Sequence, residues 1–259
     1  MIDMREHVKP EDLVTLEGVA AGLSCRGPRE KNEDRILISR IGPCLVLAVA
    51  DGVGGAKGGD IAASLALSVL EQALTRCLAE KQGSDIEELV RNSFRLAHHA
   101  VKARAREGLE GMGTTLVAAV IHGDSVVIAN TGDSRGYVIH DHKIFRTRDH
   151  SVIQALRDKN MISGGEEATH PLRSCITQCL GGPFGVDTYR LPLYPGSLVL
   201  LSSDGFHNSI SENRLQSLSG AGNPSEMVKE LVREALESAG DNTSLIIYCH
   251  GKGTSGVTQ

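Results

Sequence analysis

One stretch decides the fold: Leu45-Val46-Leu47-Ala48-Val49-Ala50-Asp51-Gly52-Val53-Gly54-Gly55. Its first six residues are apolar, Pro43 stands before them and glycines follow, and this pattern predicts a short strand buried on both faces. Asp51 therefore stands where a buried strand leaves the core.

The same junction of an apolar run with acidic residues recurs along the chain. The runs 125–131 and 197–203 lead to an aspartate, and the runs 35–38 and 244–248 closely follow acidic residues. The six carboxylates at these five junctions are Glu33, Asp34, Asp51, Asp133, Asp204 and Asp241. One such junction is an ordinary turn, but five that converge would repel one another unless cations neutralised them. Oxygen donors alone select hard ions such as Mg²⁺ or Mn²⁺, so we expect a metal centre.

Length and composition favour one domain. The chain has 259 residues, 41% of them hydrophobic, and no stretch resembles a linker. A net charge of −5 and the lack of a Lys/Arg-rich run argue against a nucleic-acid partner. No stretch approaches the roughly 20 apolar residues of a membrane span, and residues 1–7 lack the apolar core of a signal peptide. We therefore expect a cytoplasmic protein without membrane attachment.

The chain has six cysteines: Cys25, Cys44, Cys77, Cys175, Cys179 and Cys249. They form no CxxC pair, and several of them lie in apolar runs. We expect buried free thiols rather than disulfides. A redox pair of Cys175 and Cys179 is the alternative.

Two helices are expected after the glycines. Residues 59–80 repeat an apolar residue every four positions, at Ile61, Leu65, Val69, Ala73 and Cys77. A second helix starts at Ser84, which can form a capping box with Glu87. Its inner face is expected to consist of Ile86, Val90, Phe94, Ala97 and Val101. Both helices should cover one sheet face, and the adjacent His98 and His99 are interpreted as surface or packing residues because they lack metal-ligand spacing.

The remaining pattern predicts an antiparallel body. Strands at 116–121 and 125–131 form a hairpin-like sequence, and a second hairpin spans 136–150. Further helices are expected near 151–158, 211–218 and 224–238, and a last strand at 244–249. We divide the chain into a lead-in at 1–18, a domain at 19–250 with a mobile flap at about 160–184, and a tail at 251–259.

Arg29 lies four residues before Glu33 in a loop dense in charge. Its guanidinium should therefore stand close to the acidic residues, and its planar fork suits bidentate recognition of a phosphate. A solvated turn is the alternative interpretation.

Seven motifs stand in the order and approximate spacing of one known family: Arg29-x-x-Asn32-Glu33-Asp34, Asp51-Gly52-Val53-Gly54-Gly55, Gly113-Thr114-Thr115, Gly132-Asp133-Ser134-Arg135, Asp149-His150-Ser151, Ser203-Asp204-Gly205 and Asp241-Asn242-x-Ser244. Together they resemble the metal-dependent serine/threonine protein phosphatases of the PP2C type, in their short bacterial form. The resemblance implies an α+β fold, a four-layer α-β-β-α sandwich of two antiparallel sheets flanked by helices. It also implies two Mn²⁺ or Mg²⁺ ions at one end of the sandwich.

The resemblance assigns a role to each matched metal position. Asp51 corresponds to a carboxylate that bridges two ions, with the Gly52 carbonyl as a further ligand. Glu33 corresponds to a ligand of one ion, and Asp204 and Asp241 correspond to ligands of the other.

Other matched positions complete the implied site. Asp133 corresponds, together with Asp204, to the ligands of a third and weaker ion. Asp34 and Asn242 correspond to residues that support the ligands, and Arg29 corresponds to the phosphate-binding arginine. Water activated by the ions would attack phosphorus without a covalent enzyme intermediate.

Two positions depart from the family pattern. Val53 and Ala56 stand where relatives carry a histidine, so the proton donor to the leaving group stays open between water at the metals and His170 on the flap. Thr114 and Ser134 fit backbone turns better than nucleophiles, because neither has a His/Asp partner beside it in the sequence.

The expected substrates are phosphoserine and phosphothreonine proteins. The expected partner is a bacterial Ser/Thr kinase or its targets, and the chain is expected to be a monomer. The alternatives are a two-metal hydrolase of phosphodiesters or small phosphate esters, and a catalytically dead binding module. A hydrolase of phosphodiesters or small phosphate esters would be expected to have more basic residues for binding a polyanionic substrate. A dead binding module would have lost metal ligands, whereas each matched metal position keeps its oxygen donor.

Overall fold

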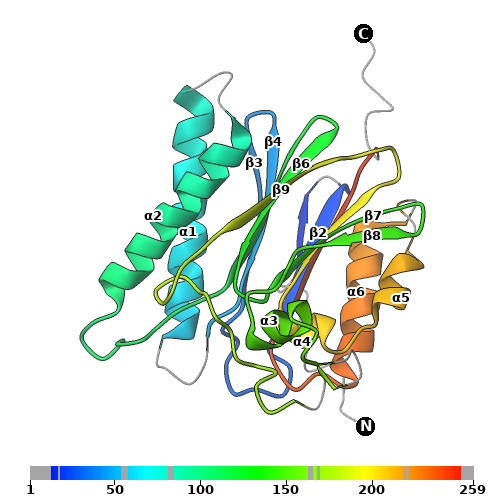
Figure 1. Cartoon of the computed structure of the whole chain (residues 1–259). Coiled ribbons are helices and arrows are strands. Elements are labelled where there is room, and N and C mark those ends of the chain that lie inside the picture. The colour runs from blue at the N-terminus through cyan, green and yellow to red at the C-terminus, as the bar shows by residue number, and fades with distance from the viewer. Residues whose placement is uncertain are drawn as a thin grey trace.

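The computed structural model describes residues 13–16, 18–53, 58–80, 85–162, 166–167, 170–218, 220 and 222–251 (Figure 1). The strands are β1 (Leu13–Leu16), β2 (Ala20–Cys25), β3 (Arg35–Ile41), β4 (Cys44–Ala50), β5 (Leu116–His122), β6 (Ser125–Thr131), β7 (Arg135–His140), β8 (Lys143–Arg146), β9 (Asp187–Pro192), β10 (Leu198–Ser202) and β11 (Thr243–Cys249). The helices are α1 (Gly59–Glu80), α2 (Ile86–Arg104), α3 (Val152–Asp158), α4 (Asp204–His207), α5 (Glu212–Gln216) and α6 (Pro224–Leu236).

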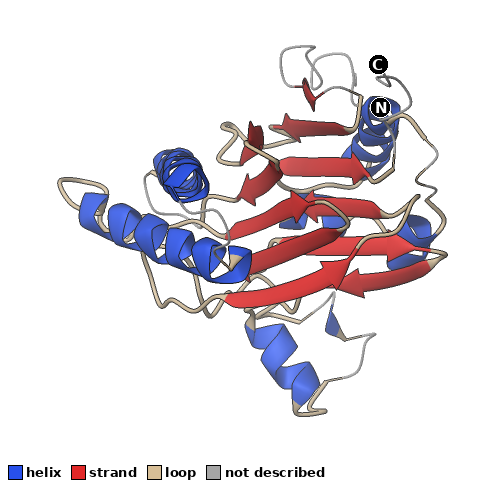
Figure 2. Ribbon diagram, turned by 90° about the horizontal axis from the view of Figure 1, so that it is seen from above, coloured by secondary structure: helices blue, strands red, loops and turns tan. Residues whose placement is uncertain are grey.

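Two antiparallel sheets form the centre of the molecule. The six-stranded sheet has the order β1-β2-β11-β10-β7-β8, and the five-stranded sheet has the order β3-β4-β5-β6-β9. In Figure 1, α1 and α2 cover the outer side of the five-stranded sheet, and α6 and α5 lie on the outer side of the six-stranded sheet. Seen from above, the strands occupy the middle and the helices lie around them (Figure 2). The predicted four-layer α-β-β-α sandwich is confirmed.

Burial of strand β4 on both faces explains why its sequence is apolar throughout. All of its residues are buried. Leu45, Leu47 and Val49 pack into the cluster between the two sheets, whereas Val46 and Ala48 pack into the cluster under α1 and α2. A strand covered on both faces needs apolar residues at every position rather than at alternate ones, so the prediction of a doubly buried strand is confirmed.

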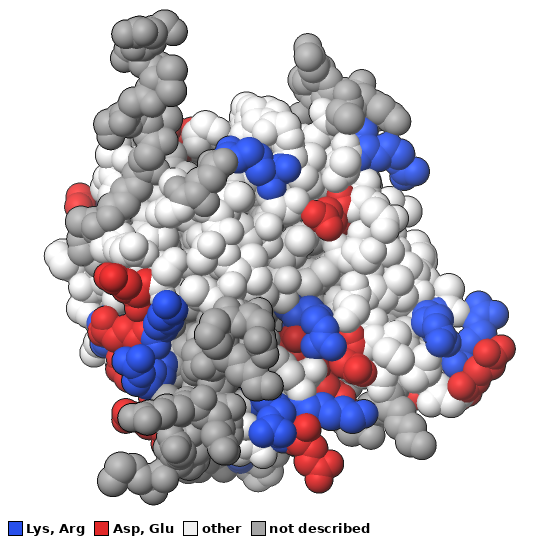
Figure 3. All heavy atoms as spheres, turned by 180° about the vertical axis from the view of Figure 1, so that it is seen from behind, with Lys and Arg blue, Asp and Glu red and all other residues white. Residues whose placement is uncertain are grey.

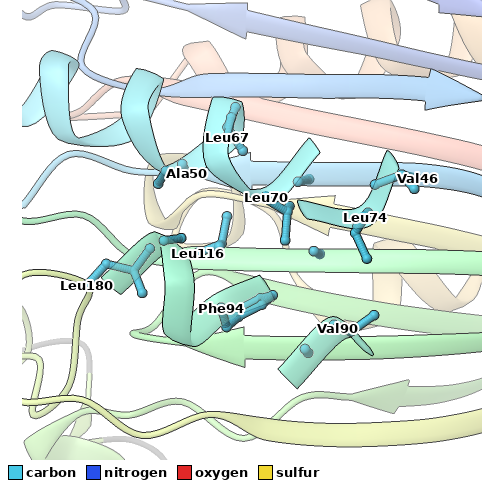
Figure 4. Close-up of a cluster of buried hydrophobic side chains, with 14 of the residues drawn as sticks. Val46, Ala50, Leu67, Leu70, Leu74, Val90, Phe94, Leu116 and Leu180 are labelled. Atoms are coloured by element: carbon cyan, nitrogen blue, oxygen red, sulfur yellow. The ribbon is translucent and has the colours of Figure 1, made fainter. Parts of the chain in front are cut away.

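Helices α1 and α2 close the outer face of the five-stranded sheet (Figure 4). Their buried side chains include Ala62, Ala63, Ala66, Leu67, Leu70, Leu74, Val90, Phe94, Ala97 and Val101. The inner face predicted for the second helix is therefore confirmed. His98 is buried and its ring stacks on Phe184 at 4.4 Å between centroids, while His99 is exposed, as expected for packing and surface residues.

Helix α1 has the predicted bounds and Ala73 of its apolar repeat is buried, but the rest of the repeat does not mark the buried face. Ile61 is 39% exposed, and Leu65 and Val69 only border the cluster. A strict four-residue repeat drifts by about 40° per step around a helix of 3.6 residues per turn. The buried face instead combines steps of three and four residues and uses alanines, which let the helix lie close to the sheet.

Three other local predictions need correction. Strand β1 lies inside the segment assigned to a lead-in and pairs with β2, so the six-stranded sheet begins before residue 19. Strand β9 was not predicted, because this edge strand is charged and ends in Pro192 instead of forming an apolar run. Ser84 lies outside the described residues, and Asp85 caps α2 by accepting a hydrogen bond from the Glu87 N–H at 3.2 Å.

One described helix is long and apolar enough to cross a membrane, by length and composition alone. The stretch is Gly59–Leu78 in α1, so the expectation that no stretch approaches a membrane span is wrong on those two criteria. The apolar composition of α1 has a structural explanation, because one face of the helix forms the cluster over the five-stranded sheet.

Charged side chains of both signs lie beside one another on the face shown in Figure 3. Several of the molecule's charges form ion pairs, such as Arg146 with Glu212 at 2.8 Å and Arg214 with Glu234 at 3.0 Å. Such exposed pairs contribute little to stability, about 0 to 1 kcal/mol each. The fold therefore depends mainly on its apolar clusters.

We expect Leu70→Ala to lower the free energy of unfolding by about 2 to 5 kcal/mol, because Leu70 is fully buried in the cluster of Figure 4 and its truncation leaves a cavity. Leu96→Ala is the matched control, since Leu96 lies on α2 but is 44% exposed, and we expect a change within about 0.5 kcal/mol. Urea unfolding measures both values. Equal effects of the two substitutions would contradict the assignment of the core.

Candidate metal centre

Strand register brings the predicted carboxylates to one end of the sandwich. Strand β3 starts where the antiparallel β4 ends, so Asp34 and Asp51 leave the five-stranded sheet at the same edge. The end of β6 reaches this edge through β5, and Asp133 follows it. In the other sheet, β10 ends where β11 starts, so Asp204 and Asp241 also share an edge.

The carboxyl groups raise one another's pKa values across the two sheets. Burial is the main cause that raises the pKa of Asp51 well above its usual value, and the charges of Asp34, Asp204, Asp133 and Asp241 add to it. Burial is also the main cause at Asp34 and Asp133, whose pKa values rise from 3.8 to about 7. Groups that oppose one another's ionisation in this way lie close together, and a bound cation would relieve the repulsion.

Asp34 carries an acceptor atom without a partner. Its side chain is buried, and its Oδ2 accepts hydrogen bonds from the hydroxyls of Ser203 and Ser244, both at 2.7 Å. Its Oδ1 is buried and has no hydrogen-bond partner. A buried carboxylate oxygen left without a donor fits a neighbouring cation or an ordered water molecule. The two serines are site residues that the sequence analysis did not assign, although both stand inside the quoted motifs.

Close backbone contact holds Glu33 against the turn after Asp51. A Cβ atom on Gly52 would lie 2.6 Å from the carbonyl carbon of Gly59, and a Cβ on Gly59 would lie 2.8 Å from Glu33 Oε2. Gly52 is therefore required where this segment meets the backbone at the start of α1. The Glu33 carboxylate consequently lies next to the segment that carries Asp51 and the Gly52 carbonyl.

Asn242 ties two segments of the site together. Its side-chain amide donates to the carbonyls of Arg26 and Lys31 at 2.7 and 2.8 Å, and its Oδ1 accepts from the Glu33 N–H at 2.8 Å. Its own N–H donates to Asp241 Oδ1 at 2.8 Å. Asn242 thus orients Asp241 and also holds the loop that carries Glu33.

Arg29 stands at the open side of this cluster. Its side chain is 57% exposed, and its Nη2 donates to Asp241 Oδ2 at 2.7 Å. The predicted proximity of the guanidinium to the acidic residues is confirmed.

The donor set fits divalent cations. In the described ranges, no three His, Cys, Asp or Glu side chains come close enough to hold an ion without other ligands. Mg²⁺ commonly keeps several water molecules and binds one or two carboxylates, so water would complete the coordination of an ion held here. The residues that would hold ions are Glu33, Asp51, Asp133, Asp204, Asp241 and the Gly52 carbonyl.

Hydroxyl and imidazole groups brace the backbone around the carboxylates. The Thr114 hydroxyl donates to the Asp51 carbonyl at 2.9 Å, and Thr114 itself forms isolated β-bridges with Gly52 and Leu180. His150 Nδ1 accepts from the Gly132 N–H at 3.3 Å, and its Nε2 lies 3.2 Å from Asp187 Oδ2. Both nitrogens of this buried ring are therefore engaged in holding strand ends.

A cavity of about 420 Å³ opens beside the carboxylates. Its lining residues are Asp133, Arg135, Arg146, Asp149, Ser151, Ile153, Glu167, Arg173, Ser174, Asp204, His207 and Asn208. Arg135 donates to both oxygens of Asp149, so this guanidinium is fixed in the wall. Glu167, Arg173 and Ser174 belong to the predicted flap, whereas His170 is not among the lining residues and Ala56 lies outside the described ones.

A family model described as protein phosphatase 2C matches residues 21–242. The chain belongs to the protein phosphatase 2C family. The matched span runs from β2 to the start of β11 and contains all of the predicted metal positions, so the resemblance seen in the seven motifs is confirmed.

Relatives in this family are bacterial phosphatases. The serine/threonine phosphatase stp of Listeria monocytogenes is 35% identical over 178 residues, which are 67% of this chain and 71% of the relative. The serine/threonine protein phosphatase PstP of Mycobacterium tuberculosis is 31% identical over 240 residues, 90% of this chain and 45% of the longer relative. A PstP catalytic domain solved in complex with two manganese ions superposes with a TM-score of 0.76 at 27% identity, covering 88% of this chain and 96% of that one.

In the presence of a chelator, we expect Asp133→Asn to stabilise the protein most at pH 8, less at pH 5, and little near pH 3. Between 3.8 and about 7, folded Asp133 keeps a proton that the unfolded chain has lost, so this group lowers stability as pH rises through that window. One pKa unit corresponds to about 1.4 kcal/mol, which places the gain at pH 8 on the order of a few kcal/mol.

Thermal and urea unfolding across this pH range measure the effect. Asp141→Asn is the control, because that carboxyl is 82% exposed in the β7–β8 turn. Parallel pH profiles of the wild type and Asp133→Asn would contradict a raised pKa of Asp133 in the folded protein.

Proposed function

We propose that this protein is a metal-dependent protein phosphatase that hydrolyses phosphoserine and phosphothreonine in phosphoproteins. The observation that carries the proposal is that strand register brings these carboxyl groups together at one end of the sandwich, where burial and then the neighbouring charges raise the pKa values of Asp34, Asp51, Asp133 and Asp204. Such a cluster is stable in its charged form only with cations, and membership of the protein phosphatase 2C family supports the same conclusion.

Each proposed ligand has a structural reason for its position. Asp51, together with Glu33, the Gly52 carbonyl, Asp204 and Asp241, would hold two Mn²⁺ or Mg²⁺ ions. The ions, when bound, supply activation of water near neutral pH and neutralise charge on the phosphoryl group. Asp133, together with Asp204, would hold a third and weaker ion.

The phosphoryl group would enter between Arg29 and the cavity. The exposed Arg29 fork donates to a carboxylate here, and the same fork suits the planar oxygen pair of a phosphate. The cavity beside Asp133 and Asp204 has room for the side chain and backbone that carry the phosphate, and Arg173 brings a further positive charge to its rim.

The proposal extends to the partner, the oligomeric state and the domain bounds of the enzyme. The enzyme would oppose a bacterial Ser/Thr kinase and act as a monomer. The catalytic domain would span about 19–250, with the segment at about 160–184 as a flap over the cavity, where Glu167, Arg173 and Ser174 line the wall.

We expect the metal-stripped protein to hydrolyse a phosphothreonine peptide only after Mn²⁺ or Mg²⁺ is added back. Asp204→Asn should lower kcat/KM by about 100-fold or more, since a ligand of the reacting centre is lost. Phosphate release measures the rate, and circular dichroism verifies that the variant is folded. Metal-independent turnover, or full activity of the folded variant, would overturn the proposed mechanism.

Arg29→Ala should lower kcat/KM for the same peptide by about 10-fold or more, because a hydrogen bond to a charged group contributes about 1.5 to 3 kcal/mol. Arg95→Ala is the control, as Arg95 is an exposed arginine of α2 whose Nη1 bonds Asn92. Equal kcat/KM values for the two variants would contradict the assignment of Arg29 to phosphate binding.

A further inference from the structure

The backbone of Asp51 is held by a reciprocal pair of hydrogen bonds with Thr115. The Thr115 N–H donates to the Asp51 carbonyl at 2.8 Å, and the Asp51 N–H donates to the Thr115 hydroxyl at 3.1 Å. Thr115 is 1% exposed. The hydroxyl is therefore a buried acceptor for the N–H of the proposed bridging residue, and water cannot replace it without access.

The same hydroxyl reaches the turn that carries Asp133. Thr115 Oγ1 lies 2.6 Å from Ser134 Oγ, and Ser134 is fully buried. Gly132 has a φ of +97°, and a Cβ atom on it would lie 2.6 Å from Thr115 Cγ2. The turn 132–134 thus wraps around the Thr115 side chain, which leaves no room for a side chain at Gly132.

Thr115 therefore stands between two turns that leave different strands. Its one hydroxyl has a single hydrogen and two acceptor sites. The Asp51 N–H occupies one acceptor site, and the Ser134 hydroxyl occupies the hydrogen or the second site. Through these two bonds, the position of Asp51 depends on the position of the turn that bears Asp133.

Thr147 forms the same reciprocal pair of hydrogen bonds with the backbone of another residue, Gly136. The Thr147 N–H donates to the Gly136 carbonyl at 2.9 Å, and the Gly136 N–H donates to the Thr147 hydroxyl at 3.0 Å. Thr147 is also fully buried. Its partner Gly136 carries no carboxylate, so Thr147 offers a matched comparison for the loss of a buried threonine hydroxyl.

We propose that Thr115 is a positioning residue that sets the separation of Asp51 and Asp133, and thereby the affinity of the centre for divalent cations. The proposal rests on the proposed function, because it takes these two aspartates as ligands. Valine has the shape of threonine and would keep the packing against Gly132. It would leave the Asp51 N–H without an acceptor and would disconnect Ser134.

The test measures Mn²⁺ binding by electron paramagnetic resonance of the free ion, which does not require turnover. We expect Thr115→Val to weaken Mn²⁺ binding by about 10- to 100-fold, the range found when groups that orient metal ligands are removed. Thr115→Ser, which restores the hydroxyl, should return the affinity to within a few-fold of the wild type. Thr147→Val should lose thermal stability comparably and bind Mn²⁺ as the wild type does.

A double-mutant cycle with Ser134→Ala tests the link between the two turns. Because Thr115 and Ser134 share one bond, we expect the double variant to bind Mn²⁺ little worse than Thr115→Val alone. Wild-type affinity in folded Thr115→Val, or the same loss in Thr147→Val, would overturn the proposal. A wild-type protein that binds Mn²⁺ without hydrolysing phosphopeptides would instead overturn the proposed function alone.

Discussion

Repulsion among carboxyl groups withdrawn from water is the constraint on which this structure depends. The groups come from both sheets, since Asp34, Asp51 and Asp133 leave one and Asp204 leaves the other. In a medium of low polarity such repulsion is costly, and the raised pKa values of Asp34 and Asp133 reflect burial first and the neighbouring carboxyl charges second. Bound cations would neutralise this repulsion and would link carboxylates of the two sheets. Folding at this end and catalysis would then require the same ions.

At the opposite end of the sandwich, side-chain hydrogen bonds join the two sheets. Asp124, in the turn between β5 and β6, lies 3.1 Å from His250 Nε2, and His250 Nδ1 lies 3.0 Å from the Tyr248 hydroxyl. This chain of hydrogen bonds connects the five-stranded sheet to the end of β11 in the six-stranded sheet. The two sheets are thus joined at this end by hydrogen bonds to an exposed carboxylate and a tyrosine hydroxyl.

Features encoded by local pattern could be predicted from the sequence. The doubly buried β4, the turn at Asp141 and His142, and the capped start of α6 at Asn223 follow from residue types and spacing. The buried face of α1 and the edge strand β9 depend on tertiary contacts, which no local pattern shows. For the site, the carboxylates could be predicted because charge at strand ends is conspicuous. Asn242 could also be identified as a support, through the family resemblance. Ser203, Ser244 and Thr115 could not, because they are common residues whose role appears only when distant turns meet.

The central claim is that these carboxylates form one centre that holds at least two divalent cations. Anomalous diffraction at the manganese edge, from crystals soaked in Mn²⁺, tests it most directly. The account predicts two strong peaks that share the Asp51 carboxylate, with Asp204 and Asp241 beside one of them and Glu33 and the Gly52 carbonyl beside the other. Peaks elsewhere, or none at Asp51 at saturating Mn²⁺, would contradict it.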